Sequence, residues 1–367
     1  MSNSHKIIVS VTNDLTTDQR VHKVCTSLQN KGYEVKLVGR LLPHSMTLDR
    51  SYPCKRFKLW FNKGFLFYAN YNIRLLIYLL FSKADILLAN DLDTLPANHL
   101  ASKMKKLHLV YDSHELFTEV PELIHRPRKQ EIWKNLEQII LPKLQYAYTV
   151  SPLIVEEYNV TYGADFKLIR NFPLLEAEEV KQPTEKDKII IYQGALNIGR
   201  GLEELILAMK FVEDAKLWLV GGGDIENELK SIVEENDLKQ KVQFLGRLPF
   251  HELKRITQQA SLGVSLEKKE GLNYAYALPN KVFDYIHAGV PVLYADLEAV
   301  KRTLDGFSVG EVLQSHEAKE LGEQLTQMLV SNQYSYWQQE CMRAKQVFNW
   351  EKEEETLFAI FDALEQD

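Results

Sequence analysis

The alternation of short apolar runs with amphipathic stretches constrains the fold of this chain more than any other feature. Residues 19–30 have helical spacing and lie between the first two apolar runs. Runs of this length between helices are typical of buried parallel strands. They occupy residues 7–11, 34–38, 86–89, 107–111, 146–150, 188–192, 216–220, 242–245, 262–265 and 292–294. The sequence therefore predicts an α/β fold with doubly wound parallel sheets, whose ligands bind at the carboxyl ends of the strands.

A polar segment separates the chain into two halves. Residues 176–187 are mostly charged and contain Pro183, which is typical of an interdomain linker. With 367 residues, the chain is long enough for two domains of ordinary size. We therefore expect one Rossmann-like domain over residues 1–175 and another over residues 186–345. The final stretch, residues 336–364, has the pattern of an aromatic helix.

Composition and the chain start bear on the compartment. Hydrophobic residues make up 45% of the chain and charged residues 26%, which is typical of a globular protein and argues against disorder or a fibrous repeat. The longest uninterrupted apolar run, Leu75 to Phe81, is too short to span a bilayer. The first residues leave no room for a signal peptide. Three widely spaced cysteines form neither a disulfide framework nor a metal site. We expect a cytoplasmic protein.

One basic, aromatic segment stands out in a chain whose net charge is −6. Residues 51–84 carry six basic side chains and no acidic one, with five aromatic residues between positions 60 and 68. The acidic balance of the whole chain argues against general nucleic-acid binding. The stretch from Lys55 to Tyr68 either faces anionic lipid headgroups or a lipid-linked substrate, or is a basic surface packed on one side and solvated on the other.

A glycine-rich turn follows the first predicted strand of the second half, over residues 193–201 (QGALNIGRG). Backbone N–H groups at such a turn favour a phosphate group. Arg200 adds a cation whose forked donors match phosphate oxygens, and Gly194 allows the backbone to approach a ligand closely. The alternative is a tight turn with a solvated arginine.

Two further strand ends carry weaker signals. Gly222 belongs to a run of three glycines, but Glu226 occupies the third position of the dinucleotide-binding pattern, which argues against NAD. Leu245 lies at the end of the strand over residues 242–245, where a free backbone edge can pair with a flat base.

The most specific motif covers residues 270–291, which include ALPNKVFDYIHAGVPV. Lys281 and Asp284 lie three residues apart on a predicted helix and share one face. The lysine can neutralise a diphosphate, and the carboxylate can accept hydrogen bonds from both hydroxyl groups of a ribose. The alternative is a surface ion pair between the two, which would stabilise the protein little.

In the first half, Asp91 and Asp93 follow one predicted strand, and His114 follows the next. Two carboxylates without a third ligand make a weak metal site, so helix capping or contacts to an acceptor are the preferred interpretation. His114 lies between Asp112 and Glu115 in the sequence and can hydrogen-bond a hydroxyl near neutral pH. The alternative is a buried histidine held by a carboxylate.

In this order, the motifs resemble the retaining glycosyltransferases of the GT-B fold, family 4 (glycosyl transferases group 1). The resemblance covers nearly the whole chain and is carried by QGALNIGRG, LVGGGD, FLG, ALPNKVFDYIHAGVPV, NDLDTLP, YDSHELF and RNFP. It implies two facing Rossmann-like domains, with an acceptor site on the first and a nucleotide-sugar donor site on the second. It also implies that the final helix, about residues 346–367, packs back on the first domain, and that hexosyl transfer needs no metal or other cofactor.

By position, the resemblance implies that Arg200 contacts the donor diphosphate and Asp284 the ribose. His114 would be the catalytic histidine near the reacting sugar. Further donor contacts are implied for Gly194, Gly222, Leu245 and Lys281, and acceptor-side contacts for Asp91, Asp93 and Glu115.

Two features depart from the family pattern. The family has two glutamates separated by seven residues, but Tyr276 lies eight residues before Asp284. Asn273 and Tyr274 are therefore the candidates for contact with the donor sugar. The glycine pair after the first strand is also missing, and residues 13–20 (NDLTTDQR) stand in its place.

We therefore expect transfer of a sugar from a UDP- or GDP-sugar to a glycan or lipid-linked acceptor, with retention of configuration, in polysaccharide or cell-envelope biosynthesis. The protein would be cytoplasmic, or peripheral at the inner face of the membrane through Lys55 to Tyr68. Two alternatives stay open: a nucleotide-sugar epimerase of the same twin-domain fold, and a non-catalytic nucleotide-sugar-binding subunit. An NAD-dependent dehydrogenase is disfavoured because neither glycine run completes the dinucleotide-binding pattern.

Overall fold

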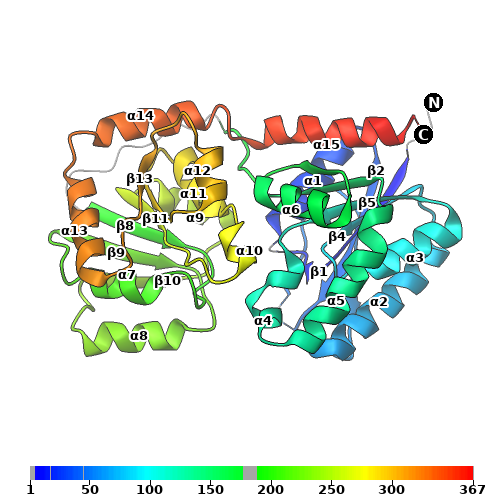
Figure 1. Cartoon of the computed structure of the whole chain (residues 1–367), viewed down its shortest axis with the longest axis horizontal. Helices are drawn as coiled ribbons and strands as arrows, with labels where there is room; N and C mark the ends of the chain where they lie inside the picture. The colour runs from blue at the N-terminus through cyan, green and yellow to red at the C-terminus, as the bar shows by residue number, and fades with distance from the viewer. Residues whose placement is uncertain (1–4, 17, 44, 177–187, 367) are drawn as a thin grey trace. The chain divides into compact units, whose positions relative to one another are not determined.

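The computed structural model describes residues 5–16, 18–43, 45–176 and 188–366, and these form two compact units (Figure 1). The first unit contains Met1–Asn171 and Glu353–Asp367, and the second contains Phe172–Lys352. Most of the predicted linker, residues 177–187, lies outside the described residues. The chain passes from one unit to the other at Asn171, before that linker, and returns at Glu353.

The first unit is built on a seven-stranded parallel sheet with the order β3-β2-β1-β4-β5-β6-β7. Its strands are β1 (Lys6–Asp14), β2 (Glu34–Leu41), β3 (Cys54–Lys58), β4 (Ile86–Asn90), β5 (His108–Ser113), β6 (Tyr146–Thr149) and β7 (Phe166–Leu168). The strand order reverses between β1 and β4, which are neighbours in the sheet. In doubly wound sheets, ligands bind at the carboxyl ends of the strands at this switch point.

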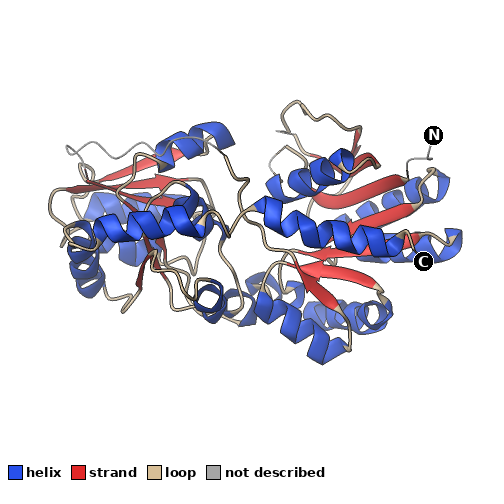
Figure 2. Cartoon of the chain, turned by 90° about the horizontal axis from the view of Figure 1, so that it is seen from above, coloured by secondary structure: helices blue, strands red, loops and turns tan. Residues whose placement is uncertain are grey.

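Helices cover both faces of this sheet (Figures 1 and 2). They are α1 (Gln19–Asn30), α2 (Gly64–Phe81), α3 (Leu95–Lys105), α4 (Pro121–Ile124), α5 (Pro127–Ile140), α6 (Pro152–Tyr162) and the larger part of α15 (Trp350–Leu364), with 3₁₀ turns at Phe117–Glu119 and Leu141–Lys143. The start of α1 shows how the sequence sets a boundary, because the Asp18 carboxylate caps it by accepting a hydrogen bond from the Val21 N–H at 3.0 Å.

The C-terminal helix α15 packs on the first unit, as the resemblance implied. Ser27 donates a hydrogen bond to Glu354 at 2.7 Å, and Arg170 pairs with Glu353 at 2.7 Å. The buried ring of Phe361 meets Tyr33 edge to face. The prediction of one helix over residues 336–364 is wrong in detail. The structure has α14 (Tyr334–Ala344) and α15 with a break between them, where Asn349 accepts a hydrogen bond from the Lys352 N–H at 3.1 Å.

The second unit has a six-stranded parallel sheet with the order β10-β9-β8-β11-β12-β13. Its strands are β8 (Lys188–Gln193), β9 (Ala215–Val220), β10 (Val242–Gly246), β11 (Leu262–Ser265), β12 (Val292–Tyr294) and β13 (Gly310–Val312). Its helices are α7 (Leu202–Ala208), α8 (Glu226–Glu235), α9 (Phe250–Thr257), α10 (Leu272–Ala275), α11 (Asn280–His287), α12 (Glu298–Thr303), α13 (Ala318–Leu329) and α14. The switch point of this sheet lies between β8 and β11.

The α/β class and the two parallel sheets are confirmed. The strands that the sequence did not predict are β3, β7 and β13, which are short and lie at or next to the sheet edges. An edge strand buries less of its surface, so it needs no apolar run. The sequence CKRFK of β3 shows this, since Phe57 is its one fully buried residue.

One helix departs from the expectation that no segment could span a bilayer. By length and composition, α2 is long and apolar enough to cross a membrane, with a mean hydropathy of 1.2 over Gly64–Phe81 and 22% of that window buried. The apolar run Leu75 to Phe81 is only the last part of this helix.

Candidate functional site

A buried charge cluster occupies the switch point of the second sheet. β8 ends at Gln193 and β11 at Ser265, and the segment after β11 places Glu267 in the interior. The Glu267 carboxylate lies 2.5 Å from the Lys281 Nζ and 3.3 Å from an Arg200 guanidinium nitrogen. It also accepts a hydrogen bond from the Ser265 hydroxyl at 2.6 Å. One carboxylate therefore holds together the two cations that the sequence assigned to a donor diphosphate.

The cluster carries a net positive charge. Burial by itself would raise the pKa of Glu267, but Lys281 and Arg200 lower it to about 2. Burial opposes the charge on Arg200, and Glu267 still raises its pKa. Two cations therefore share one ionised carboxylate. The alternative of a surface ion pair on α11 does not describe Lys281, because this side chain is buried and pairs with Glu267.

Arg200 retains binding capacity towards a further group. Its Nε is buried and has no hydrogen-bond partner among the described residues. Its guanidinium lies 5.0 Å from the ring centre of Tyr274, on the short helix α10. Lys281 lies 4.4 Å from the ring centre of Tyr192. An anion that entered here would find one free N–H donor and two cations packed against aromatic rings.

Glycines in the second unit allow the two loops after β8 and β9 to pack closely against each other. A Cβ atom on Gly221 would lie 1.9 Å from the carbonyl oxygen of Gly194, and one on Gly223 would lie 2.2 Å from that of Leu196. Gly194 has a φ of +137° and donates its N–H to Val220 at 2.9 Å. The loops after β8 and β9 therefore touch backbone to backbone, which explains the glycine runs without a dinucleotide.

The remaining glycine of the run and the end of β10 lie beside these loops. A Cβ atom on Gly222 would lie 3.0 Å from the Arg247 Nε. β10 is an edge strand of the sheet, and the carbonyl of its final residue, Gly246, accepts a hydrogen bond from the Gly221 N–H at 2.8 Å. Leu245 is therefore placed on an edge strand whose end is fixed to the glycine loop.

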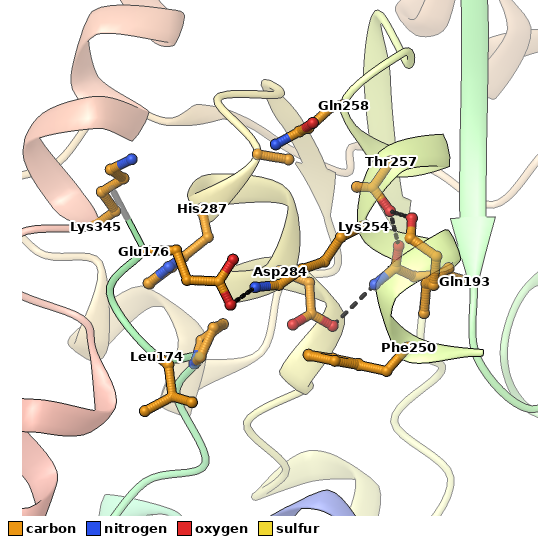
Figure 3. Close-up of a pocket in the computed structure, with 13 residues that line it drawn as sticks. Leu174, Glu176, Gln193, Phe250, Lys254, Thr257, Gln258, Asp284, His287 and Lys345 are labelled. Atoms are coloured by element: carbon orange, nitrogen blue, oxygen red, sulfur yellow. Dashed lines mark hydrogen bonds and ion pairs between the residues drawn. The ribbon is translucent and has the colours of Figure 1, made fainter. Parts of the chain in front are cut away.

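Asp284 lies one turn after Lys281 on α11 and lines a pocket of the second unit (Figure 3). Its carboxylate accepts a hydrogen bond from the Gln193 side chain at 2.9 Å, and Gln193 accepts one from the Thr257 hydroxyl at 2.7 Å. Phe250 and Leu253 of α9 form the apolar wall of the pocket. The carboxylate is thus oriented by a strand end and supported by a buried threonine.

The two predicted donor contacts, Arg200 and Asp284, are connected through Lys281 of α11, although Arg200 and Lys281 are not among the residues that line the pocket at Asp284. Glu267 connects Arg200 to Lys281, and Asp284 lies one turn further along the same helix. Gly194, which follows Gln193, packs so closely that a Cβ atom there would lie 3.4 Å from the Lys281 side chain. Asn273 is buried on α10, next to Tyr274.

The first unit has a second cluster of charges at its own switch point. β4 leads into Asp91, whose φ of +60° is rare for a residue with a side chain, and β5 leads into His114. The imidazole lies 3.3 Å from Asp91 through Nδ1 and 3.2 Å from Asp112 through Nε2. Asp91 also accepts a hydrogen bond from the His114 N–H at 2.9 Å. Arg20 pairs with the far side of Asp112 at 2.8 Å.

These contacts set the protonation states. Burial lowers the pKa of His114, but Asp91 and Asp112 raise it to about 9, so the ring is a cation at neutral pH. Burial and, to a smaller extent, the charge of Asp91 raise the pKa of Asp93 to about 8, which favours the protonated carboxyl at neutral pH. Thr12 donates a hydrogen bond to it at 2.6 Å.

The surroundings of His114 differ from its sequence neighbours. The sequence places it between Asp112 and Glu115, whereas in the structure the imidazole contacts Asp112 and Asp91. Both carboxylates favour the charged ring and raise the pKa of His114 to about 9. The charge of Glu115 contributes instead to the raised pKa of Asp93. Among the described residues, no group of three or more His, Cys, Asp or Glu side chains is placed to hold a metal ion.

Three residues of these clusters were not predicted: Glu267, Arg20 and Thr12. A signal for Glu267 was present, because it follows a predicted strand of the second half by two residues. Arg20 and Thr12 carry no comparable signal. Each becomes visible only when the parallel pairing of β1 with β4 and of β4 with β5 brings the strand ends together.

Comparison with known proteins identifies the second unit. Residues 176–343 match the family model described as glycosyl transferases group 1. An uncharacterized glycosyltransferase of Methanocaldococcus jannaschii is 28% identical over 132 residues, which are 34% of this chain. The match spans about a third of that relative's length, 32%.

Solved structures match the whole chain. Sucrose-phosphate synthase from Thermosynechococcus elongatus superposes with a TM-score of 0.80 at 16% identity, covering 98% of this chain and 99% of the other. HepE from Anabaena, solved in complex with UDP and glucose, superposes with a TM-score of 0.73 at 14% identity, covering 98% of this chain and 100% of the other. A variant of TarM from S. aureus, solved with fondaparinux, alpha-GlcNAc-glycerol and UDP, superposes with a TM-score of 0.74 at 10% identity, covering 97% of this chain and 99% of the other.

At these identities, the structural likeness establishes the fold. Two parallel Rossmann-like sheets, each with its switch point at the end of its first strand, agree with that likeness. The chain has the GT-B fold, and its residues 176–343 match the family model of glycosyl transferases group 1.

Proposed function

We propose that this protein transfers a sugar from a nucleoside-diphosphate sugar, a UDP- or GDP-sugar, to a glycan or lipid-linked acceptor with retention of the anomeric configuration. The observation that carries the proposal is the Arg200–Glu267–Lys281 cluster at the switch point of the second sheet, with Asp284 one turn away. Relatives of the fold have been solved with UDP and with sugars, namely HepE and TarM.

The donor diphosphate would bind to Arg200 and Lys281. The Arg200 Nε is buried and has no hydrogen-bond partner in the described part of the chain, so a phosphate oxygen would satisfy a donor that is otherwise left unpaired. Ion pairs with Glu267 hold both buried cations in place before the donor binds. Little reorganisation is therefore needed when negative charge develops on the leaving diphosphate. Asn273 and Tyr274, on α10 beside Arg200, would contact the transferred sugar.

Asp284 would accept hydrogen bonds from the two ribose hydroxyls. Gln193 and Thr257 hold the carboxylate in one orientation, and the glycine loop lies next to them. Gly194, Gly222 and Leu245 would contribute backbone surface to the donor site. The nucleotide base would stack or pair along the end of β10, where the sheet ends.

The first unit would bind the acceptor through Asp91, Asp93 and Glu115. His114, which is a cation at neutral pH, can donate a hydrogen bond but cannot accept a proton, so it would orient and stabilise rather than act as a base. The leaving diphosphate would then take the proton from the acceptor hydroxyl on the same face of the sugar, which gives retention. In this mechanism no metal is required. A cytoplasmic location and a role in polysaccharide or cell-envelope biosynthesis belong to the same proposal.

Thermal-shift measurement with UDP, GDP, ADP and their sugars tests the donor class first. A ligand that binds only the folded protein raises the melting temperature with increasing concentration. We expect one nucleoside diphosphate to stabilise the wild type and to lose its effect in Arg200→Ala. The exposed pair Lys239–Glu234 offers a matched control, because Lys239→Ala removes a cation from the same unit far along the sequence from the cluster. Indifference of the wild type to every nucleotide would overturn the proposal.

The stereochemistry is tested separately. With the identified donor and a simple acceptor, NMR of the product during the first turnovers reports the anomeric configuration. A product with the donor's configuration supports retention, and an inverted product contradicts it. A new donor sugar formed in the absence of any acceptor would identify an epimerase instead.

A further inference from the structure

Helix α2 has apolar side chains on two opposite faces. Its inner face is fully buried in the core of the first unit and consists of Phe67, Tyr71, Leu75 and Leu79. What we call its outer face consists of Leu66, Ile73, Ile77 and Phe81, which are 54%, 60%, 53% and 88% exposed. A helix on the surface of a water-soluble protein normally has polar residues on the side away from the core. The outer face of α2 therefore has the composition of a surface that meets an apolar medium.

Exposed aromatic side chains lie at the start of this helix. Trp60 is 77% exposed, Phe61 45% and Phe65 69%. The Arg74 guanidinium lies 4.5 Å from the Trp60 ring centre, and the backbone N–H of Trp60 donates a hydrogen bond to the Asn70 side-chain oxygen at 3.2 Å. Trp60 is thus fixed against α2 while its ring stays in solvent. Tryptophan in such a position is typical of the boundary between lipid headgroups and acyl chains.

The charges on the segment that contains the outer face have one sign. Residues 51–84 contain six basic residues and no acidic one, and Lys58, Lys63 and Lys83 are exposed. At the C-terminal end of α2, Lys105 of α3 donates a hydrogen bond to the Leu79 carbonyl at 3.1 Å. A second copy of this chain would bring the same positive charge to the contact and would be repelled. Anionic lipid headgroups are complementary to it.

The contacts of α2 with the rest of the first unit favour association with a membrane surface over a transmembrane orientation of this helix. The Tyr71 hydroxyl, on the inner face, donates a hydrogen bond to the Val11 carbonyl at 2.6 Å. Asn72 donates to the Asp93 carbonyl at 2.7 Å and accepts from the Ala97 N–H at 3.2 Å. A helix held to β1 and α3 in this way cannot leave the sheet to span a bilayer without breaking the core. It can lie in the plane of the interface with its outer face in the apolar region.

We propose that the outer face of α2, together with Trp60 and Phe61, binds the surface of an anionic phospholipid bilayer, with Lys58, Lys63 and Lys83 at the level of the phosphates. The binding needs no nucleotide and no acceptor, so it stands or falls independently of the proposed function. Because Asn72 is bonded to the Asp93 backbone, the membrane surface and the carboxylates of the first unit would lie on adjoining parts of one unit.

Flotation of the full-length protein with lipid vesicles tests the proposal. Vesicles of phosphatidylcholine alone are compared with vesicles in which one lipid in four is phosphatidylglycerol, at about 0.1 M and about 1 M salt. We expect the protein to float with the anionic vesicles at low salt, and to float at least tenfold less with neutral vesicles or at high salt. Equal binding to both vesicle types would overturn the charge complementarity on which the proposal rests.

Two sets of variants locate the contact. Ile73→Ser combined with Ile77→Ser removes the centre of the outer face, and we expect at least a tenfold loss of binding to anionic vesicles. Val160→Ser and Val330→Ser replace comparably exposed apolar residues elsewhere, at 85% and 66% exposure, and should leave binding unchanged. Unchanged melting temperature shows that each variant is folded. Full binding by the folded double variant would overturn the proposal.

Fluorescence gives a readout that a purely structural role would not produce. Phosphatidylcholine with brominated acyl chains quenches tryptophan only where the ring reaches the acyl region. We expect quenching in the wild type with brominated anionic vesicles, and its loss in Trp60→Phe. Absence of quenching, or a sedimentation-measured dimer that Ile73→Ser with Ile77→Ser converts to a monomer without vesicle binding, would identify a protein contact and contradict the proposal.

Discussion

Glu267 and Lys281 form a buried ion pair, 2.5 Å between carboxylate and ammonium, at the switch point of the second sheet. The same carboxylate lies 3.3 Å from Arg200. The proposed diphosphate site needs positive charge, yet two buried cations without a counter-ion would repel each other and lose their hydration. Glu267 pairs with both cations in the free protein, and the three side chains together keep one net positive charge.

Replacing Glu267 by glutamine should destabilise the protein and also make it more responsive to nucleotide. The substitution leaves Lys281 and Arg200 buried without their anion, so we expect the free energy of unfolding of the second unit to fall by about 3 kcal/mol. Urea denaturation measures the loss. A nucleoside diphosphate replaces the missing charge, so its thermal shift should be larger in Glu267→Gln than in the wild type. Glu235→Gln, at an exposed position at the end of α8, is the control and should change neither quantity.

Asp284→Asn should distinguish a contact with the ribose from a contact with the diphosphate. If the carboxylate binds the ribose, affinity for UDP or GDP should fall about tenfold or more, because charged hydrogen bonds to two hydroxyls are weakened. Affinity for inorganic pyrophosphate, which has no ribose, should change little. Lys281→Ala should weaken both ligands. An equal loss for pyrophosphate and nucleotide in Asp284→Asn would show that this carboxylate acts on the diphosphate or on the fold.

The stability of the first unit should fall as the pH rises above neutral. The pKa of His114 in the folded protein is about 9, above the ordinary value of 6.5, so its contribution is fully present below pH 6.5 and is lost as the pH rises through 9. The pKa of Asp93 is raised from 3.8 to about 8, so the unfolded chain loses this proton first and the stability also falls between about pH 4 and pH 8. Denaturation at a series of pH values measures the summed effect of His114 and Asp93 on the free energy of unfolding.

His114→Gln isolates the histidine from the aspartate. It should remove the decrease in stability between pH 6.5 and 9 that belongs to the imidazole, at most about 3 kcal/mol, and leave the part that belongs to Asp93. His251→Gln, at an exposed position in the second unit, should leave the pH profile unchanged. A wild-type stability that stays flat from pH 6 to pH 9.5 would mean that the imidazole is not held as a cation.

Two glycine substitutions should differ sharply. Gly221→Ala places a Cβ atom 1.9 Å from the Gly194 carbonyl oxygen, so the loops after β8 and β9 must separate, and we expect a loss of about 3 kcal/mol in stability together with weaker nucleotide binding. Gly246→Ala also has a positive φ, +67°, but no atom lies within 4 Å of its Cβ, so about 1 kcal/mol should be lost. Thermal melts compare the two, and equal losses would show that loop contact is not the cause.

Much of the architecture could be predicted from the sequence, because buried parallel strands must be apolar and helices between them must be amphipathic. This periodicity revealed β8 and β11, and so the switch point where Arg200 and Lys281 meet. It missed β3, because an edge strand tolerates CKRFK. It could not show that Gly221 and Gly223 pack against the backbone of the loop after β8, because a close approach of two backbones requires the same residues as a close approach to a phosphate.

The chemistry of the sites depended on contacts between distant strands, which the sequence does not show. The position of Glu267 two residues after a predicted strand was a weak signal, but its role depends on contact with Arg200, which is 67 positions away in the sequence. The charge of His114 depends on Asp91, 23 residues away, whose backbone takes a left-handed conformation to reach it. The sequence could show which polar side chains follow the strands, but it could not show the protonation state of His114, which depends on the contact with Asp91.

Isothermal titration of the wild type and Arg200→Ala with the nucleoside diphosphate that gives the largest thermal shift tests the central claim most directly. The structure predicts a binding constant at least tenfold weaker in Arg200→Ala, with Arg200→Lys in between because a lysine keeps the charge but loses the forked donors. Affinity that is the same in the wild type and in Arg200→Ala would contradict the assignment of this charge cluster to the donor diphosphate.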